Sequence, residues 1–292
     1  MTQSSFRPRR SCLYMPASNE RALEKAKTLS ADTIIFDLED AVAPDAKSDA
    51  REGAFDAVGS GDYGARELVV RINGMDTPWF THDMKRMCAS GAHAILVPKV
   101  TSAKDIASLT DFMENEEAHL EKKLWVMIEM PLAVINIAEI ASMSEHKRLS
   151  TLVMGFNDLA KEMRAEQDRT LFTPAMAQSI MAARAHSLNI IDSVYNDFND
   201  PDGLAVECEQ ARKYGFDGKT LIHPSQIEIA NAAFSPSAEK IAEAAAIIAA
   251  FADPVNAGKG VITVDGKMTE ILHLKQAKQT VAIAEAIASH GA

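Results

Sequence analysis

The chain has 292 residues, of which 47% are hydrophobic and 24% charged, and its formal net charge is -11 at pH 7. This length and composition are typical of a globular protein with a large buried core, enough for one barrel or two smaller domains. The negative charge argues against binding to nucleic acid or to anionic membranes, because the overall field attracts neither polyanion. A phosphate-bearing ligand would therefore need a local basic patch.

The three cysteines, Cys12, Cys88 and Cys208, are far apart in the sequence and show no CxxC spacing. This pattern argues against a disulfide framework and against a thiolate metal site, and it fits a reducing compartment. The N-terminal segment is basic, but no apolar stretch of signal-peptide length follows it, and no run approaches a membrane span. We therefore expect a soluble, cytoplasmic protein.

Short apolar runs alternate with longer amphipathic segments from the start of the chain to about residue 235. Uninterrupted apolar runs are typical of strands buried on both faces of a parallel sheet. Without a GxGxxG or GxxxxGK[ST] pattern, this alternation predicts an α/β fold, a (β/α)8 TIM barrel over residues 1–235. The predicted strands, in chain order, are 12–15, 33–38, 67–72, 94–99, 124–129, 151–156, 190–195 and 219–223.

The pattern changes after residue 235. An alanine-rich helix starts after a Ser-Pro pair and stops at an Asp-Pro pair, and a glycine-containing hairpin around Asp265-Gly266 follows. A last helix is predicted from about residue 271 to 289. Residues 236–292 are thus a predicted C-terminal helix, hairpin and lid helix, surplus to the barrel, which we expect to contact a neighbouring subunit.

Polar residues end most of the predicted strands. In barrel enzymes the chemistry lies at the C-terminal ends of the strands, so these residues are candidates for the site. Any one of them could instead be a helix cap or a solvated turn residue. Barrel closure brings them to one rim, where several carboxylates repel one another unless a cation lies between them. They are Asp37, Glu39, Asp40, Arg71, Asn73, Lys99, Glu129, Asn157, Asp158, Asp192, Tyr195, Asp197 and His223.

The oxygen-rich rim indicates a hard divalent cation. Without a Cys or His cluster, Mg²⁺ (or Mn²⁺) held by one or two carboxylates is favoured. Glu129 and Asp158 end adjacent strands, so they are the best candidate pair. Arg71 offers a planar cation suited to a carboxylate or a developing enolate oxygen, and its alternative role is a structural ion pair with Asp37 or Glu39.

The segments DLEDAVAP, VRIN and GKTLIHP occur in this order along the chain. With them, the sequence resembles the CitE-like acyl-CoA lyases of the HpcH/HpaI aldolase superfamily, especially the malyl-CoA and citramalyl-CoA lyases. The resemblance covers essentially the whole chain, and RINGMDTPW is particularly similar to malyl-CoA lyases.

The resemblance assigns roles to individual residues. It places the magnesium ligands at Glu129 and Asp158, in agreement with the strand-end argument, and a substrate-binding arginine at Arg71. Glu39 corresponds to an acid that orders the waters of the metal and orients Arg71, so it is a predicted catalytic residue. The predicted substrate-binding residues are Tyr14, Met15, Asn19, Lys25, Arg71, Glu129, Asn157, Ile222 and His223. For His223 we favour a positioning role over catalysis.

The chain departs from the family pattern at two positions. Family members usually carry Glu-Asp where this chain has Asn157-Asp158, so one negative charge beside the metal is missing. They also usually carry Asp at the position of Glu270, where the acid serves a neighbouring subunit as proton-transfer group. A glutamate keeps the carboxylate but reaches further, and a displacement of about 1 Å can cost about a hundredfold in rate.

The implied function is a magnesium-dependent carbon–carbon lyase. It would cleave or form a 3-hydroxyacyl-CoA such as malyl-CoA or citramalyl-CoA, with acetyl-CoA and a 2-oxo acid as products, in a homotrimer or hexamer. Arg71, Glu39 and Glu270 would be its catalytic residues. One alternative is a protein like the citrate lyase beta subunit or a CoA-free class II pyruvate aldolase, which tend to lack the GKGVITVDGKMTE tail. Another is a weakly catalytic binding or regulatory paralogue, suggested by Asn157 and Glu270.

Overall fold

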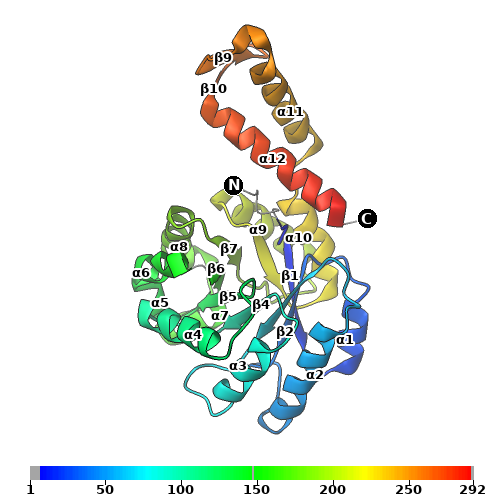
Figure 1. Cartoon of the computed structure of the whole chain (residues 1–292), viewed down its shortest axis with the longest axis vertical. Helices are drawn as coiled ribbons and strands as arrows, with labels where there is room; N and C mark the ends of the chain where they lie inside the picture. The colour runs from blue at the N-terminus through cyan, green and yellow to red at the C-terminus, as the bar shows by residue number, and fades with distance from the viewer. Residues whose placement is uncertain (1–6, 147, 291–292) are drawn as a thin grey trace. The chain divides into compact units, whose positions relative to one another are not determined.

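The computed structural model describes residues 7–146 and 148–290. The chain divides into two compact units: residues 9–233 form the first, and residues 234–290, with Arg7 and Pro8, belong to the second. Figure 1 labels most of the helices and strands of both units. Within the described residues, no helix combines the length and apolar character that a bilayer span requires.

The first unit is a closed barrel of parallel strands, so the predicted (β/α)8 fold is confirmed. Each strand pairs with its sequence neighbour, and β8 pairs with β1 to close the ring. The strands are β1 (Ser11–Pro16), β2 (Thr33–Asp37), β3 (Glu67–Arg71), β4 (Ala94–Val97), β5 (Lys123–Ile128), β6 (Leu149–Met154), β7 (Asn189–Asp192) and β8 (Gly218–Leu221).

The predicted strands have the right number and order, and differ from the observed ones at their ends. The strand predicted over 94–99 ends at Val97, because Lys99 takes a left-handed conformation, φ 57°, that cannot continue a strand. The strand predicted over 151–156 ends earlier, since Phe156 is already the first residue of a helix.

Helices follow the strands around the barrel, and several are capped by side chains at their N-termini, as at Asn19, Ser102 and Asp200. Short 3-10 turns at η3 (Arg169–Phe172) and η4 (Pro224–Gln226) precede α8 and α10. The helices are α1 (Glu20–Ala26), α2 (Lys47–Gly59), α3 (Phe80–Cys88), α4 (Ala103–Asn115), α5 (Pro131–Ile135), α6 (Ile137–Ser142), α7 (Phe156–Met163), α8 (Thr173–Ala185), α9 (Pro201–Tyr214) and α10 (Ile227–Phe234).

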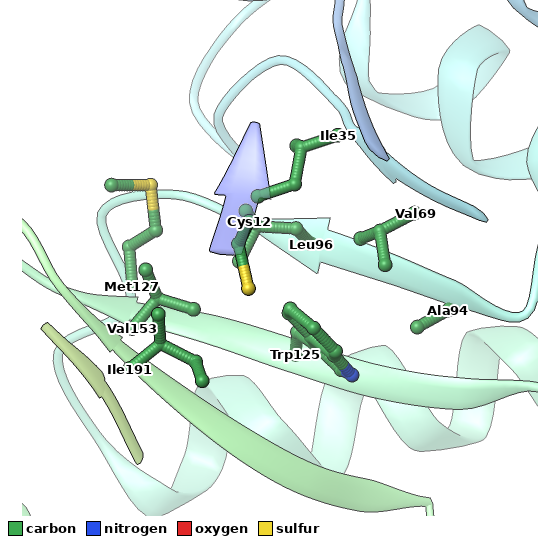
Figure 2. Close-up of a cluster of buried hydrophobic side chains, with 9 residues drawn as sticks. All are labelled: Cys12, Ile35, Val69, Ala94, Leu96, Trp125, Met127, Val153 and Ile191. Carbon is green, nitrogen blue, oxygen red and sulfur yellow. The ribbon is translucent and has the colours of Figure 1, made fainter. Parts of the chain in front are cut away.

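Side chains from the strands fill the barrel interior. Figure 2 shows the cluster, in which Trp125 is fully buried and Met127 lies near its edge. Burying one large apolar side chain contributes about 1.5–3 kcal/mol, so this cluster is a main source of stability for the barrel. Its members are Cys12, Ile35, Val69, Ala94, Leu96, Trp125, Met127, Val153 and Ile191.

The second unit contains α11 (Ala238–Ala252), a hairpin of β9 (Val261–Val264) and β10 (Lys267–Glu270), and α12 (Ile271–His290). The hairpin turns at Asp265-Gly266, where both residues have positive φ (47° and 75°). Two consecutive positive φ angles are the requirement of a type I′ turn, for which Asp-Gly is a preferred pair. The predicted C-terminal hairpin and long helix are therefore confirmed.

Candidate active site

A cavity of about 340 Å³ lies at the C-terminal ends of the barrel strands. This is the volume range of small-molecule sites. Residues at or just after β1, β2, β3, β5, β6, β7 and β8 line it. The described lining includes four carboxylates, Asp37, Asp40, Glu129 and Asp158, and one guanidinium, that of Arg71. The barrel has thus gathered charged groups from distant parts of the sequence.

Arg71 and Asp37 form a bidentate, buried ion pair. They lie opposite each other in the register of β2 and β3. Arg71 Nε donates to Asp37 Oδ1 at 2.7 Å, and Nη2 donates to Oδ2 at 2.6 Å. Burial alone would raise the pKa of Asp37, but the guanidinium and its hydrogen bonds outweigh burial, so that the pKa lies below its ordinary value. The alternative that the sequence left open for Arg71, an ion pair with Asp37, is therefore present, and Arg71 also lines the cavity.

Glu39 lies between two cations. Its Oε2 is 2.9 Å from Arg71 Nη1, and its Oε1 accepts from Lys99 Nζ at 2.9 Å. The Oε2 contact has the distance of an ion pair without the geometry of a hydrogen bond. Arg71 Cζ also lies 4.7 Å from the ring centre of Tyr14, within cation–π range. The guanidinium is therefore fixed from three sides, by Asp37, Glu39 and Tyr14.

Glu129 follows β5 and is a buried acid of the cavity with a raised pKa. It is 1% exposed, and its Oε1 accepts the backbone N–H of Lys99 at 2.8 Å. Its Oε2 has no hydrogen-bond partner among the described residues. Burial, and next the charges of Glu39 and Asp158, raise the pKa of Glu129 to about 8. A buried carboxylate oxygen without a donor requires either a proton or a cation.

Asp158 lies in the first turn of α7, after β6, and its charge acts on Glu129. Because β5 pairs with β6, the two acids lie just beyond the ends of adjacent strands, as predicted. Within residues 7–146 and 148–290, no three His, Cys, Asp or Glu side chains converge as a metal cluster. Two carboxylates completed by water and substrate are nevertheless a usual arrangement for Mg²⁺. The donorless Oε2 of Glu129 fits such an ion.

Asn157 belongs to a cluster of three carboxamides at the rim. Its Oδ1 accepts from Gln167 Nε2 and, at 3.0 Å, from Asn196 Nδ2. Asn196 Nδ2 also donates to Gln167 Oε1 at 3.0 Å. These bonds fix the orientation of the Asn157 amide, and they give the wall beside Asp158 a neutral surface.

Six residues with a predicted catalytic, substrate-binding or metal-binding role line the cavity together, and Glu39 contacts one of them, Arg71. Tyr14 reaches the cavity from β1, and Ile222 follows β8. The six are Tyr14, Arg71, Glu129, Asn157, Asp158 and Ile222.

Other predicted substrate-binding residues do not line this cavity. Met15 is buried, at 5% exposed. Asn19 caps α1 by accepting the N–H of Ala22, and Lys25 lies in the last turn of the same helix. His223 is exposed, accepts the N–H of Ser225 and stacks on Phe198 with ring centres 5.0 Å apart. Their predicted role in substrate binding stays a prediction, and it would require contacts with a part of the ligand that lies outside this cavity.

Glu270 lies in the second unit, at the end of β10, and is exposed. Its backbone N–H donates to His273 Nδ1 at 2.9 Å. Its predicted role across a subunit interface stays a prediction.

Asp192 was a predicted rim residue, and it lies instead in a buried ion network. Lys219 Nζ donates to Asp192 at 2.8 Å and to Glu207 at 2.5 Å, and Arg169 donates to both oxygens of Asp192 at 3.1 and 3.0 Å. Asp192 and Lys219 are fully buried. Buried charges need such partners, so the network joins β7 and β8 to α9 and η3.

The sequence did not single out Met127, Gly155, Ser193 and Thr220, which also line the cavity. Ser193 directly follows Asp192 at the end of β7, so its position was the signal that could have indicated it. Position 155 requires glycine for a steric reason: a Cβ there would lie 2.6 Å from Oε2 of Glu129 and 2.7 Å from the Cβ of Glu129.

Residues 10–224 match the family model of the HpcH/HpaI aldolase/citrate lyase proteins. The chain belongs to this family. The resemblance noted in the sequence is thereby confirmed.

Among relatives in this HpcH/HpaI family, the chain is 51% identical to a (3S)-malyl-CoA thioesterase of Cereibacter sphaeroides, over 98% of each chain. It is 33% identical to the citrate lyase subunit beta of Leuconostoc mesenteroides, over 96% of this chain and 94% of that protein. It is 31% identical to an L-malyl-CoA/beta-methylmalyl-CoA lyase of Cereibacter sphaeroides, over 97% and 96% of the two chains.

Solved structures of relatives share the fold. The CitE protein of Mycobacterium tuberculosis, in complex with magnesium, acetoacetate and coenzyme A, matches with a TM-score of 0.74 and 26% identity, over 95% of this chain and 98% of that one. A citrate lyase from Burkholderia xenovorans LB400 matches with a TM-score of 0.82 at 20% identity, over 98% of this chain and 94% of that one, which shows the fold alone.

Proposed function

We propose that the protein is a magnesium-dependent enzyme that hydrolyses the thioester of a malyl-CoA-type ester. The observation that carries this proposal is the 51% identity, over 98% of both chains, to a (3S)-malyl-CoA thioesterase. The lyase that acts on the same kind of ester is only 31% identical. The proposal keeps the substrate class expected from the sequence and replaces carbon–carbon cleavage by hydrolysis as the main reaction.

The two reactions start from the same bound ester, which explains why the rim residues alone favour neither. In hydrolysis, water adds its oxygen to the thioester carbon, the carbon–sulfur bond breaks, and the sulfur leaves with a proton as free CoA. In lyase cleavage, the bond between the hydroxyl-bearing carbon and the methylene breaks, and the thioester survives as acetyl-CoA. Only hydrolysis releases a thiol.

Glu129 and Asp158 would hold the magnesium ion. This proposal is supported by the donorless Oε2 of Glu129 and by magnesium in the structure of the Mycobacterium tuberculosis CitE. A bound Mg²⁺ supplies Lewis-acid polarisation of a substrate oxygen. The backbone N–H of Lys99 holds the other oxygen of Glu129, so the carboxylate presents a fixed face to the cavity.

Arg71 would bind a carboxylate or a developing oxyanion of the ester. Asp37 takes two of its N–H groups, so the guanidinium has little freedom to rotate and is preorganised before substrate arrives. Glu39 contacts Arg71 and Lys99 from behind, so we assign it a positioning role. Tyr14 covers one face of the guanidinium and keeps water from it.

The discriminating experiment is product analysis. Malyl-CoA is incubated with the purified protein and Mg²⁺, and free thiol, acetyl-CoA and glyoxylate are measured together. Hydrolysis predicts one thiol per ester consumed, with malate as the other product and no glyoxylate. Glyoxylate and acetyl-CoA in equal amounts without thiol would instead establish the lyase. Glu129→Gln and chelation by EDTA should abolish either reaction.

A citrate lyase beta-like activity is the second candidate. The tail was expected to separate the two, but the match to the Leuconostoc subunit covers 96% of this chain, so the tail does not discriminate. Turnover of citryl thioesters in the same assay decides this point. A binding or regulatory paralogue predicts substrate binding without turnover of any of these esters.

A further inference from the structure

The helix that carries Asp158 cannot cap its own N-terminus. Gly155 is the N-cap residue of α7 and has no side chain to accept a hydrogen bond. No larger residue fits there, because a Cβ would lie 2.7 Å from the Cβ of Glu129 and 2.6 Å from its Oε2. The first N–H groups of a helix have no partner within the helix, and a buried N–H without an acceptor is costly. The steric demand of Glu129 therefore creates a need for an acceptor from elsewhere in the fold.

Ser193 supplies that acceptor from the neighbouring strand. Its Oγ accepts the N–H of Phe156, the first residue of α7, at 2.9 Å. The preceding N–H, that of Gly155, donates to the carbonyl of Ile128 in β5 at 3.1 Å. The N–H groups of Gly155 and Phe156 thus connect the start of α7 to the two neighbouring strands, to β5 next to Glu129 and to the end of β7.

Ser193 is itself held firmly. It is 1% exposed, and its carbonyl oxygen accepts from the buried Lys219 Nζ at 2.6 Å. Lys219 is fixed by Asp192 and Glu207. The position of the Ser193 hydroxyl therefore depends on the buried ion network outside the cavity. One hydrogen bond, to the N–H of Phe156, links that hydroxyl to α7.

We infer that Ser193 is a positioning residue of the metal site, which sets Asp158 relative to Glu129 by capping α7 from β7. The inference rests on the proposed metal role of those two acids. It does not make Ser193 a nucleophile: among the described residues, its Oγ has no hydrogen bond with a His, Asp or Glu side chain that could act as the activating base.

The test measures Mn²⁺ binding alone, by titration and by the electron paramagnetic resonance spectrum of bound Mn²⁺, without substrate. Ser193→Ala removes the acceptor, and Ser193→Cys keeps the volume but offers a weak acceptor. Partners that orient metal ligands typically contribute about 10–100-fold to affinity. We expect Ser193→Ala to bind Mn²⁺ about tenfold more weakly with an altered spectrum, and Ser193→Cys to weaken binding also, even if the alanine variant does not fold.

Ser237→Ala is the matched control. Ser237 caps α11 in the second unit, where its side chain accepts the N–H of Lys240, so this variant also loses a helix cap. It should bind Mn²⁺ as the wild type does. Unchanged Mn²⁺ affinity in both Ser193 variants overturns the inference, and so does an equal loss in Ser237→Ala. If Glu129→Gln binds Mn²⁺ normally, the proposed metal site itself is wrong.

Discussion

Lys99 donates its backbone N–H to Glu129 from a left-handed conformation, with φ 57° and an N–O distance of 2.8 Å. A residue with a Cβ is disfavoured in this region by roughly 1–2 kcal/mol, so the fold retains a local strain next to the proposed metal ligand. The side chain of the same residue turns to Glu39. One residue therefore holds two acids, one through its main chain and one through its ammonium group.

Lys99→Gly separates these two roles. Glycine relieves a strain of about 1 kcal/mol, and the lost ion pair, whose lysine side chain is 38% exposed, contributes about 0–1 kcal/mol. The free energy of unfolding should change by less than about 1 kcal/mol, while Mn²⁺ binding persists because the N–H remains. Turnover should fall, because Glu39 loses its ammonium partner. Denaturant unfolding and Mn²⁺ titration check this, and a loss of Mn²⁺ binding would contradict it.

Arg71→Lys keeps the charge but should lose about 100-fold or more in kcat. An ammonium group cannot donate two parallel hydrogen bonds to Asp37 and still face the cavity, so the preorganised orientation is lost. Steady-state kinetics with malyl-CoA measure the effect. Near-normal turnover would demote Arg71 to a structural role.

Asn157→Glu introduces beside Asp158 the second acid that the resemblance to the acyl-CoA lyases leads us to expect. A second negative charge beside Asp158 should raise the KM for an anionic ester by about tenfold, because it repels the substrate, and should tighten Mg²⁺ binding, because it attracts the cation. Asn157→Gln is the matched control, because glutamine has the shape of glutamate without its charge. Equal KM values for the two variants would show that charge at this position is irrelevant.

Glu270 is predicted to act in the site of a neighbouring subunit, since a closed homo-oligomer can present the same segment to every site. Mixing Arg71→Ala protomers with Glu270→Ala protomers should then restore part of the activity after subunit exchange. Full activity of Glu270→Ala alone would exclude a catalytic role. A faster Glu270→Asp variant would indicate that the longer acid detunes the site.

The three cysteines should resist thiol reagents in the native state. All are buried, and burial raises the pKa of Cys88 and of Cys208 to about 11 and that of Cys12 further. Because the thiolate is the reactive form, native labelling should be slow at pH 8 and accelerate about tenfold per pH unit up to pH 11. The labelling rate of the unfolded chain should level off near pH 9. Ellman titration with and without guanidinium distinguishes these profiles.

The strands could be predicted because burial on both faces leaves a run such as residues 33–38 almost wholly apolar. The acids at strand ends were predictable for the same reason, since a charge directly after such a run marks the rim. Asp192 shows the limit of that rule: a strand end also borders the helices, and its partners Lys219 and Arg169 are distant in sequence.

The position of Ser193 after a strand could have indicated a cavity residue, but its capping role could not be predicted, because it arises from a contact with Phe156 across 37 positions. The orientation of the Asn157 amide was hidden for a similar reason. Its partners Gln167 and Asn196 lie in two different loops, which only the closed barrel brings together.

The contact between Gly155 and Glu129 links what the two positions can tolerate during divergence. A descendant that keeps the acid must keep the glycine, and so must one that replaces the glutamate by any residue with a Cβ, because the 2.7 Å contact with that Cβ persists; only glycine at 129 would open room for alanine or serine at 155. Joint substitution of Gly155 and Glu129 would therefore mark lineages in which the barrel no longer binds a cation at this site.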